Sequence, residues 1–203
     1  SFLLQATLSV DGSLLIRTDG SAEGNLSAPD AVHLKSRRVN GLVPIISGTS
    51  LAGALRARAV RILNSLNAYN EAKTNSFVEE MFGTAKNTSD AREGGSGEDT
   101  SHISKLRIKE CAIENSLEYV HTRVKIDRFT GGAFPSGLFS EQPSFGEPNG
   151  KTHVTVELEL RDPTKAQIGL LLFLIKDLWT GDLPLGGQSS IGRGRLKGES
   201  ALL

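Results

Sequence analysis

The chain has 203 residues, of which 38% are hydrophobic and 23% are charged. This is an ordinary globular composition, long enough for one large domain with insertions or two small domains. Basic and acidic residues number 23 each, so the net charge is zero. A protein that is basic overall is therefore excluded, and any nucleic-acid site must be a local patch.

The longest apolar run, 168–175, is too short to cross a bilayer. The lone Cys111 allows no internal disulfide, so we expect a reducing, cytoplasmic location.

Hydrophobic periodicity predicts a succession of strands and helices. In chain order, the expected elements are a strand at 2–10, a loop at 18–29, a hairpin turn at 40–41, helices at 50–66 and 75–82, a surface loop at 84–101, strands at 106–109 and 152–160, a helix at about 165–179 and a closing strand at 194–202. Thr49 or Ser50 is expected to cap the first helix, and Thr164 with Gln167 forms a capping box before the last. The apolar face of the last helix is predicted to use Ile168, Leu171, Leu172, Ile175 and Leu178.

The main elements follow the order strand, helix, strand, strand, helix, strand. This βαββαβ order is typical of α+β proteins with the ferredoxin-like arrangement, which the RNA-recognition (RRM-like) fold shares. No internal repeat or linker divides the chain, so we expect one elaborated domain over residues 1–203. A long insertion at 121–145 separates two core elements, and a segment of this length usually carries a function.

Residues 186–195 combine four glycines with two serines and two arginines. Glycine frees the backbone to form a concave nest of N–H donors, and guanidinium groups bind phosphate with two parallel hydrogen bonds. The predicted RNA-backbone contacts in this stretch are Gly187, Ser189, Ser190, Arg193 and Arg195. The structural alternative is a plain glycine turn before the last strand.

The start of the first long helix is a second candidate anion site. Helix N-termini present free N–H groups and the positive end of the helix dipole. The predicted RNA contacts here are Ser47, Thr49, Ser50, Arg56 and Arg58. Ordinary helix capping is the alternative, and the two roles are compatible.

The insertion at 121–145 carries basic residues and phenylalanines among glycines and prolines. Arg123 and Lys125 alternate with apolar residues, so one face of this strand is basic, and Arg128 follows closely. Phe134 is predicted to stack on nucleic-acid bases, a contact that tolerates any sequence. A solvated charged face and a small apolar cluster are the structural alternatives.

Four segments, in this order, resemble motifs of the RAMP superfamily. They are PIISGTSLAGALR at 44–56, FG at 82–83, RVKIDRFTGGA at 123–133 and GGQSSIGRG at 186–194. Within the superfamily, the chain is most similar to the repeated backbone subunit of type III CRISPR effector complexes. The resemblance covers nearly the whole chain.

The resemblance implies a ferredoxin-like palm, about 1–120 and 151–203, and a thumb, about 121–150. It also implies assembly with neighbouring RAMP subunits and other effector subunits along a guide RNA, cleavage of a complementary single-stranded target RNA, and a divalent metal, Mg²⁺. The fold and partners of that family are expectations for this chain.

Asp30 is the candidate catalytic residue, because the family resemblance implies an aspartate in this loop. Lys35, Arg37 and Arg38 follow it and are predicted to hold RNA phosphate. The carboxylate would orient or deprotonate the target's own 2′-OH, or hold the metal. Asp19 and Glu23 are alternative catalytic carboxylates in the same loop. The structural alternative is that Asp30 only forms a turn.

Two other functions remain open at this point. One is an architectural guide-RNA-binding subunit without cleavage activity. The other is a stand-alone guide-processing ribonuclease, which would need a catalytic histidine near the first helix. None of the four histidines, His33, His102, His121 and His153, shows metal-ligand spacing. We interpret His33 as a surface residue and His153 as structural.

Overall fold

The regular elements of the chain are defined in a computed structural model that describes residues 1–19, 28–39, 41–66, 70–84 and 103–203. In chain order they are β1 (Phe2–Asp11), β2 (Ser13–Leu14), β3 (Arg17–Asp19), β4 (Ala31–His33), β5 (Lys35–Arg38), β6 (Gly41–Ile46), α1 (Gly48–Leu66), α2 (Glu71–Phe82), β7 (Leu106–Ile108), β8 (Cys111–Glu114), β9 (Leu117–Glu118), β10 (His121–Ile126), β11 (Ala133–Gln142), β12 (Ser144–Phe145), β13 (His153–Leu160), α3 (Lys165–Trp179), the 3-10 turn η3 (Ser189–Ile191) and β14 (Arg195–Leu202). No helix in these ranges is long and apolar enough to cross a membrane. Apart from Thr84, the surface loop expected at 84–101 lies outside the described residues.

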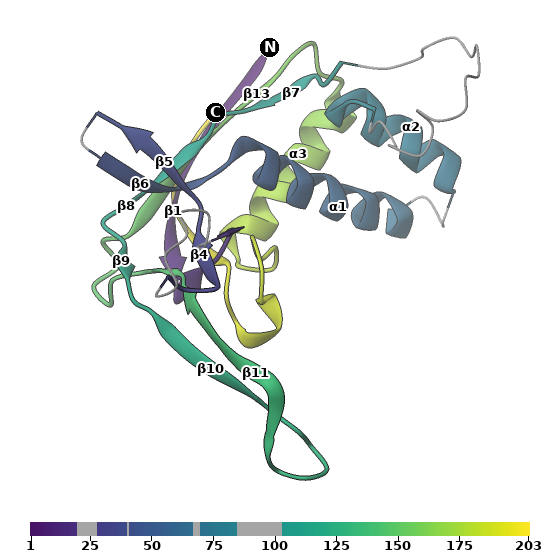
Figure 1. Ribbon diagram of the computed structural model, residues 1–203. Helices are drawn as coiled ribbons and strands as arrows, with labels where there is room; N and C mark the ends of the chain where they lie inside the picture. The colour runs from purple at the N-terminus through teal and green to yellow at the C-terminus, as the bar shows by residue number, and fades with distance from the viewer. Residues whose placement is uncertain (20–27, 40, 67–69, 85–102) are drawn as a thin grey trace, which may run out of the picture.

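The larger sheet has the strand order β14-β1-β13-β8-β6-β5, with β7 also paired to β13. Strand β1 lies next to the edge strand β14 and pairs antiparallel with both β13 and β14. Helices α1, α2 and α3 lie on one side of this sheet (Figure 1). The predicted α+β class is confirmed. The ferredoxin-like βαββαβ arrangement stays a prediction, because six strands precede α1 and seven lie between α2 and α3 in the described residues. The hairpin β5–β6 extends the sheet beyond β8.

The core lies between this sheet and its helices. Alternation along β1 buries Leu4 and Leu8 at 3% and 0% exposure, and the intervening residues face the other side. Leu51 and Leu55 of α1 and Leu174 of α3 are completely buried in the same cluster. Packing of apolar helix stripes on an apolar sheet face therefore determines the architecture.

The buried stripe of α3 differs from the predicted one. Leu172 was expected to face the core but is 41% exposed, whereas Leu170 and Leu174 are buried. The run 168–175 is apolar on nearly all sides, so helical periodicity alone distinguishes poorly between two rotations of the helix. The capping box of Thr164 and Gln167 is formed as predicted.

Helix α2 starts earlier than the sequence indicates. It was expected at 75–82 and spans Glu71–Phe82, because the side chain of Asn70 accepts a hydrogen bond from the N–H of Lys73 at 3.2 Å. The expected end before Gly83 is observed.

A second sheet, with order β10-β11-β4-β3, holds the protruding part of the molecule. Strands β10 and β11 form a long hairpin that extends away from the main sheet and helices (Figure 1). At its base, β11 pairs in parallel with β4, with Glu141 opposite Ala31. The hairpin covers 121–142, within the expected thumb, and β12 returns to a small sheet with β2 and β9.

Candidate functional site

Asp30 lies immediately before β4, with its side chain exposed. Its Oδ2 accepts a hydrogen bond from the N–H of Ser140 at 2.7 Å and another from Ser140 Oγ at 3.3 Å. The N–H of Asp30 donates to the same Oγ at 3.3 Å. Ser140 belongs to β11, so the candidate carboxylate is fixed to the base of the hairpin. Within the described ranges, Asp30 Oδ1 has no hydrogen-bond partner.

Glu141, the residue after Ser140, points to the opposite face of β11 and is 1% exposed. Its Oε2 lies 3.0 Å from Nη1 of Arg193, and its Oε1 lies 3.1 Å from Nη2 of Arg17. Gln188 donates to Oε1, and Arg123 lies 3.9 Å from Oε2. The carboxylate thus joins β3, the hairpin and the glycine-rich stretch.

Arg193 is 4% exposed, and its burial lowers the pKa of its guanidinium, an effect that Glu141 opposes. A buried, ion-paired arginine has little surface to offer RNA. Arg17 is 58% exposed and Arg123 is 36% exposed beside the same carboxylate. These two side chains retain accessible positive charge, since a single carboxylate neutralises only one of three guanidinium groups.

The glycines of residues 186–195 serve close backbone contacts. Gly186 has φ +77°, and a Cβ there would lie 2.4 Å from the carbonyl oxygen of Leu15. Gly194 has φ +84°, and its Cβ would lie 2.1 Å from the carbonyl oxygen of Leu185. Both positions therefore require glycine for folding, which favours the structural alternative for these two residues.

The remainder of the glycine-rich stretch is more accessible. Ser189 and Ser190 form the exposed turn η3, and Gly187 is half-buried. Arg195 is exposed and donates to the carbonyl oxygen of Gly181 at 3.2 Å. An RNA contact of Gly187, Ser189, Ser190 and Arg195 remains a prediction.

Several basic residues predicted to bind RNA are engaged within the protein. Lys35 Nζ lies 2.6 Å from Glu118, and Arg38 pairs with Glu110. Arg58 Nε lies 2.6 Å from Asp177. Arg56 Nη1 donates to the carbonyl oxygen of Gly83 at 2.7 Å, which ties α1 to the end of α2. These contacts account for the four side chains structurally, and their contact with RNA stays a prediction.

Arg37, Lys125 and Arg128 are exposed and make no ion pair with any described residue. Lys125 Nζ lies 4.5 Å above the ring of Phe134, which is itself 44% exposed on the neighbouring strand. An aromatic face beside a free cation is a combination that suits a nucleic-acid base and its phosphate.

The N-terminal cap of α1 is Ser47, whereas the sequence predicted Thr49 or Ser50. Its Oγ accepts a hydrogen bond from the N–H of Ser50 at 3.1 Å and contacts both the Ser50 and Thr49 hydroxyls, at 2.8 and 3.2 Å. The sequence was misleading because all three residues have side chains that cap helices. The hydroxyl cluster opens into a cleft of about 490 Å³ beside Glu110.

His33 is buried, at 1% exposure, and the surface interpretation was wrong. In the neutral tautomer with the proton on Nε2, Nδ1 accepts a hydrogen bond from the N–H of Ile16 at 3.2 Å and Nε2 donates to the carbonyl oxygen of Ile45 at 2.9 Å. Nδ1 also lies 3.1 Å from the carbonyl oxygen of Leu14. Burial lowers the pKa of this imidazole. The side chain fills the junction of β4 with β6 and with the residues between β2 and β3, which the local sequence does not reveal.

The other expected candidates can be placed only in part. His121 is exposed, and its ring lies 4.9 Å from that of Phe145 in a tilted arrangement. His153 on β13 lies 3.0 Å from Glu114. His102, Glu23 and the side chain of Asp19 fall outside the described part of the chain. Among the described residues, no group of three histidines, cysteines or carboxylates could hold a metal ion.

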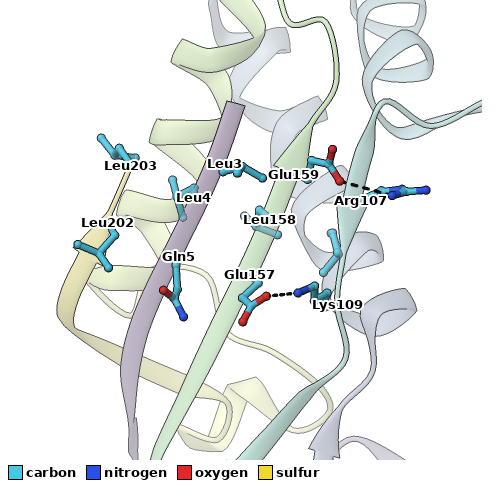
Figure 2. A pocket seen from close by; sticks show the side chains of 11 residues that line it. Leu3, Leu4, Gln5, Arg107, Lys109, Glu157, Leu158, Glu159, Leu202 and Leu203 are labelled. Carbon is cyan, nitrogen blue, oxygen red and sulfur yellow. Dashed lines mark hydrogen bonds and ion pairs between the residues drawn. The ribbon is translucent and has the colours of Figure 1, made fainter. Parts of the chain in front are cut away.

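A groove of about 920 Å³ lies on the face of the large sheet that the helices leave open. Figure 2 shows two ion pairs in this groove: Arg107 of β7 with Glu159 of β13, and Lys109, the residue after β7, with Glu157 of β13. It is at the end of the sheet where both chain termini lie, away from the hairpin and β4 (Figure 1). The charged side chains of the groove are paired with one another, so they leave no unpaired positive charge for RNA phosphate. The candidate site is therefore the region around Asp30.

The chain belongs to the RAMP superfamily, because the sequence model of that family matches residues 7–197. Its fold is similar to that of a chain in a cryo-EM structure of the type III-B Cmr-beta complex bound to cognate target RNA, with a TM-score of 0.62 and 12% identity. The alignment covers 98% of this chain and 59% of the other chain, so this chain spans about three fifths of that protein's length. No curated protein matches the sequence.

Sequence reasoning missed three residues that the structure brings into the site: Arg17, Ser140 and Glu141. No local motif marks them, because their roles come from the parallel pairing of β4 with β11 and from the contact of β11 with the glycine-rich stretch.

Proposed function

We propose that this protein is a guide-RNA-binding subunit of a type III CRISPR ribonucleoprotein and that it cleaves complementary target RNA at Asp30. Membership of the RAMP superfamily and the fold shared with a chain of an RNA-bound Cmr complex support the RNA-binding role. The observation that carries the cleavage role is an exposed carboxylate, fixed at the base of a protruding basic hairpin with one oxygen unpartnered among the described residues.

RNA would follow the exposed basic surface around the hairpin. Arg17, Arg123, Lys125 and Arg128 supply positive charge along it, and Phe134 offers an aromatic face for stacking. Because the net charge of the chain is zero, the chain as a whole does not attract RNA, and the affinity would come from this local patch. Guide RNA and single-stranded target RNA are therefore the partners that the surface suits.

Cleavage would use the 2′-hydroxyl of the target nucleotide as the nucleophile. Asp30 Oδ1 accepts the hydroxyl proton while a bond forms between the 2′-oxygen and phosphorus. The bond from phosphorus to the 5′-oxygen breaks, and that oxygen takes a proton from water. The products are a 2′,3′-cyclic phosphate and a 5′-hydroxyl. Alignment of the attacking oxygen with the leaving oxygen supplies much of the rate enhancement.

In an alternative to direct proton transfer, Asp30 Oδ1 would bind a divalent metal such as Mg²⁺ instead of accepting the proton. This ion is commonly bound by one or two carboxylates together with phosphate oxygens and water, and Asp30 Oδ1 is an available oxygen ligand. When bound, the metal would neutralise charge on the scissile phosphate. Asp30 would hold it, and the basic residues would hold the RNA.

The decisive experiment is Asp30→Asn in the assembled ribonucleoprotein. The amide keeps the shape but cannot accept the proton, so we expect target cleavage to fall by at least ~100-fold, the lower range for loss of positioned acid–base chemistry. RNA binding should be unchanged or slightly tighter, since a negative charge near phosphate is removed. Asp162→Asn, on the exposed turn between β13 and α3, is the matched control.

Wild-type cleavage by the Asp30→Asn complex would contradict the catalytic assignment and favour a purely architectural guide-binding subunit. A stand-alone guide-processing ribonuclease is disfavoured by His33, because the histidine nearest to α1 in sequence is buried and cannot reach RNA.

A further inference from the structure

We propose that Ser140 is the positioning residue of the Asp30 carboxylate, so that the base of the hairpin aims the free carboxylate oxygen at the target RNA. The inference rests on the proposed function of Asp30. It adds a second residue to the site, contributed by a strand that is distant in sequence.

The geometry of the pair fixes both ends of Asp30. Ser140 Oγ accepts from the N–H of Asp30 at 3.3 Å and donates to its Oδ2 at 3.3 Å, which closes a ring through one hydroxyl. The N–H of Ser140 adds a 2.7 Å hydrogen bond to the same Oδ2. Oδ2 is thus occupied twice, whereas Oδ1 has no hydrogen-bond partner among the described residues. A hydroxyl and an amide that hold one oxygen define the orientation of the other.

The surroundings offer Asp30 little other support. The parallel pairing of β4 with β11 is registered at Ala31 opposite Glu141 and at Val32 opposite Gln142, so Asp30 lies one residue outside it. Its side chain is exposed and packs in no core. Ser140 is the described residue that fixes its orientation.

Ser140 contributes little to the folded core. It is only half-buried on β11, and its side-chain hydrogen bonds go to Asp30 alone among the described residues. Loss of its hydroxyl leaves the main-chain pairing of the hairpin intact. A change in cleavage without a change in stability is therefore the signature of positioning.

The test compares Ser140→Ala with Ser140→Thr in the assembled ribonucleoprotein, by single-turnover cleavage of a complementary RNA. We expect Ser140→Ala to lower the cleavage rate by roughly 10-fold, the value of one hydrogen bond to a charged group. Ser140→Thr keeps the hydroxyl, and threonine is favoured in strands. Because the hydrogen bond is retained, we expect this variant to cleave at roughly half of the wild-type rate or more. RNA affinity and melting temperature should not change.

Two further variants make the test specific. Ser9→Ala, on β1, is the matched control. It removes a hydroxyl that donates a hydrogen bond of the same length, 3.3 Å, to the carbonyl oxygen of Lys197, and the variant should cleave normally. In an Asp30→Asn background, Ser140→Ala should cause no further loss, because the group that it positions is already inactive.

The outcomes separate this inference from the proposed function. If Asp30→Asn abolishes cleavage while Ser140→Ala cleaves at the wild-type rate, positioning by the hydroxyl is refuted and the catalytic role of Asp30 stands. Equal impairment of the alanine and threonine variants with a lowered melting temperature also refutes positioning. An active Asp30→Asn complex overturns the proposed function itself.

Discussion

Glu141 and Arg193 form a buried ion pair, with 3.0 Å between Oε2 and Nη1 and side-chain exposures of 1% and 5%. The pair joins the base of the hairpin to the glycine-rich stretch. Removal of one member of a buried pair leaves the other charge uncompensated, which costs about 3–5 kcal/mol of unfolding free energy. The contact therefore makes the fold of the glycine-rich stretch depend on β11.

We predict that Glu141→Gln lowers the unfolding free energy by about 3 kcal/mol, the low end of that range, because nearby polar groups relieve part of the cost. Denaturant titration of the purified chain measures the change. Arg17→Ala removes an exposed partner of the same carboxylate and should cost under about 1 kcal/mol. Equal losses for both variants would show that burial of the pair is unimportant.

We predict that Lys125→Ala with Arg128→Ala weakens RNA binding for all sequences alike. Each lost phosphate contact should reduce the slope of log affinity against log salt by roughly 1. The melting temperature should stay the same, since both side chains are exposed. Lys109→Ala, in an exposed ion pair on the open sheet face, is the control and should leave the slope unchanged. An unaltered slope for the double variant would remove the hairpin from the RNA surface.

We predict that stability falls on acidification because of His33. Burial depresses the pKa of this histidine in the folded chain, so between that depressed pKa and about 6.5 the unfolded chain binds more protons. The stability from neutral His33 is complete above about 6.5 and is lost as the pH falls through the folded pKa.

Urea titrations between about pH 5 and 7.5 measure this effect. The pH dependence in this window should disappear in His33→Leu, although that variant is less stable because the Ile16 N–H and Ile45 carbonyl lose their partner. His121→Gln leaves His33 intact and should keep the dependence. A slope that survives in His33→Leu would mean that other groups cause it.

We predict that Cys111 does not react with thiol reagents in the folded protein. Burial raises the pKa of its thiol to about 11, and only the thiolate is nucleophilic. At pH 8 the reactive fraction is on the order of one in a thousand before access is considered. Labelling with a chromogenic disulfide should become rapid only in denaturant, and rapid labelling of the native chain would show that β8 opens readily.

The sequence predicted the elements of this fold better than their contacts. The alternation along β1 and the capping box at Thr164 are local patterns, and both elements formed as expected. The face of α3 was misjudged because the run 168–175 is apolar on nearly every side. His33 was misjudged because its burial depends on β6, a strand that follows it in the chain.

The candidate site shows the same limit. Asp30 could be proposed because family resemblance identifies its loop, whereas Ser140 lies in no motif and becomes visible only through the pairing of β11 with β4. Arg193 matched the pattern of a phosphate ligand, yet its nearest charged partner is the buried Glu141. A charge pattern cannot distinguish an accessible arginine from one paired with a distant acid.

The place of β1 between β13 and β14 has a consequence for the newly synthesised chain. Both neighbours of β1, the strands β13 and β14, come from the last quarter of the sequence. At about 5–20 residues per second, β1 would wait on the order of ten seconds for a partner during translation. For that time an apolar strand has two open edges, which is a template for aggregation. We therefore expect the nascent chain to bind chaperones that recognise apolar segments, and its yield to depend on the rate of translation as well as on final stability.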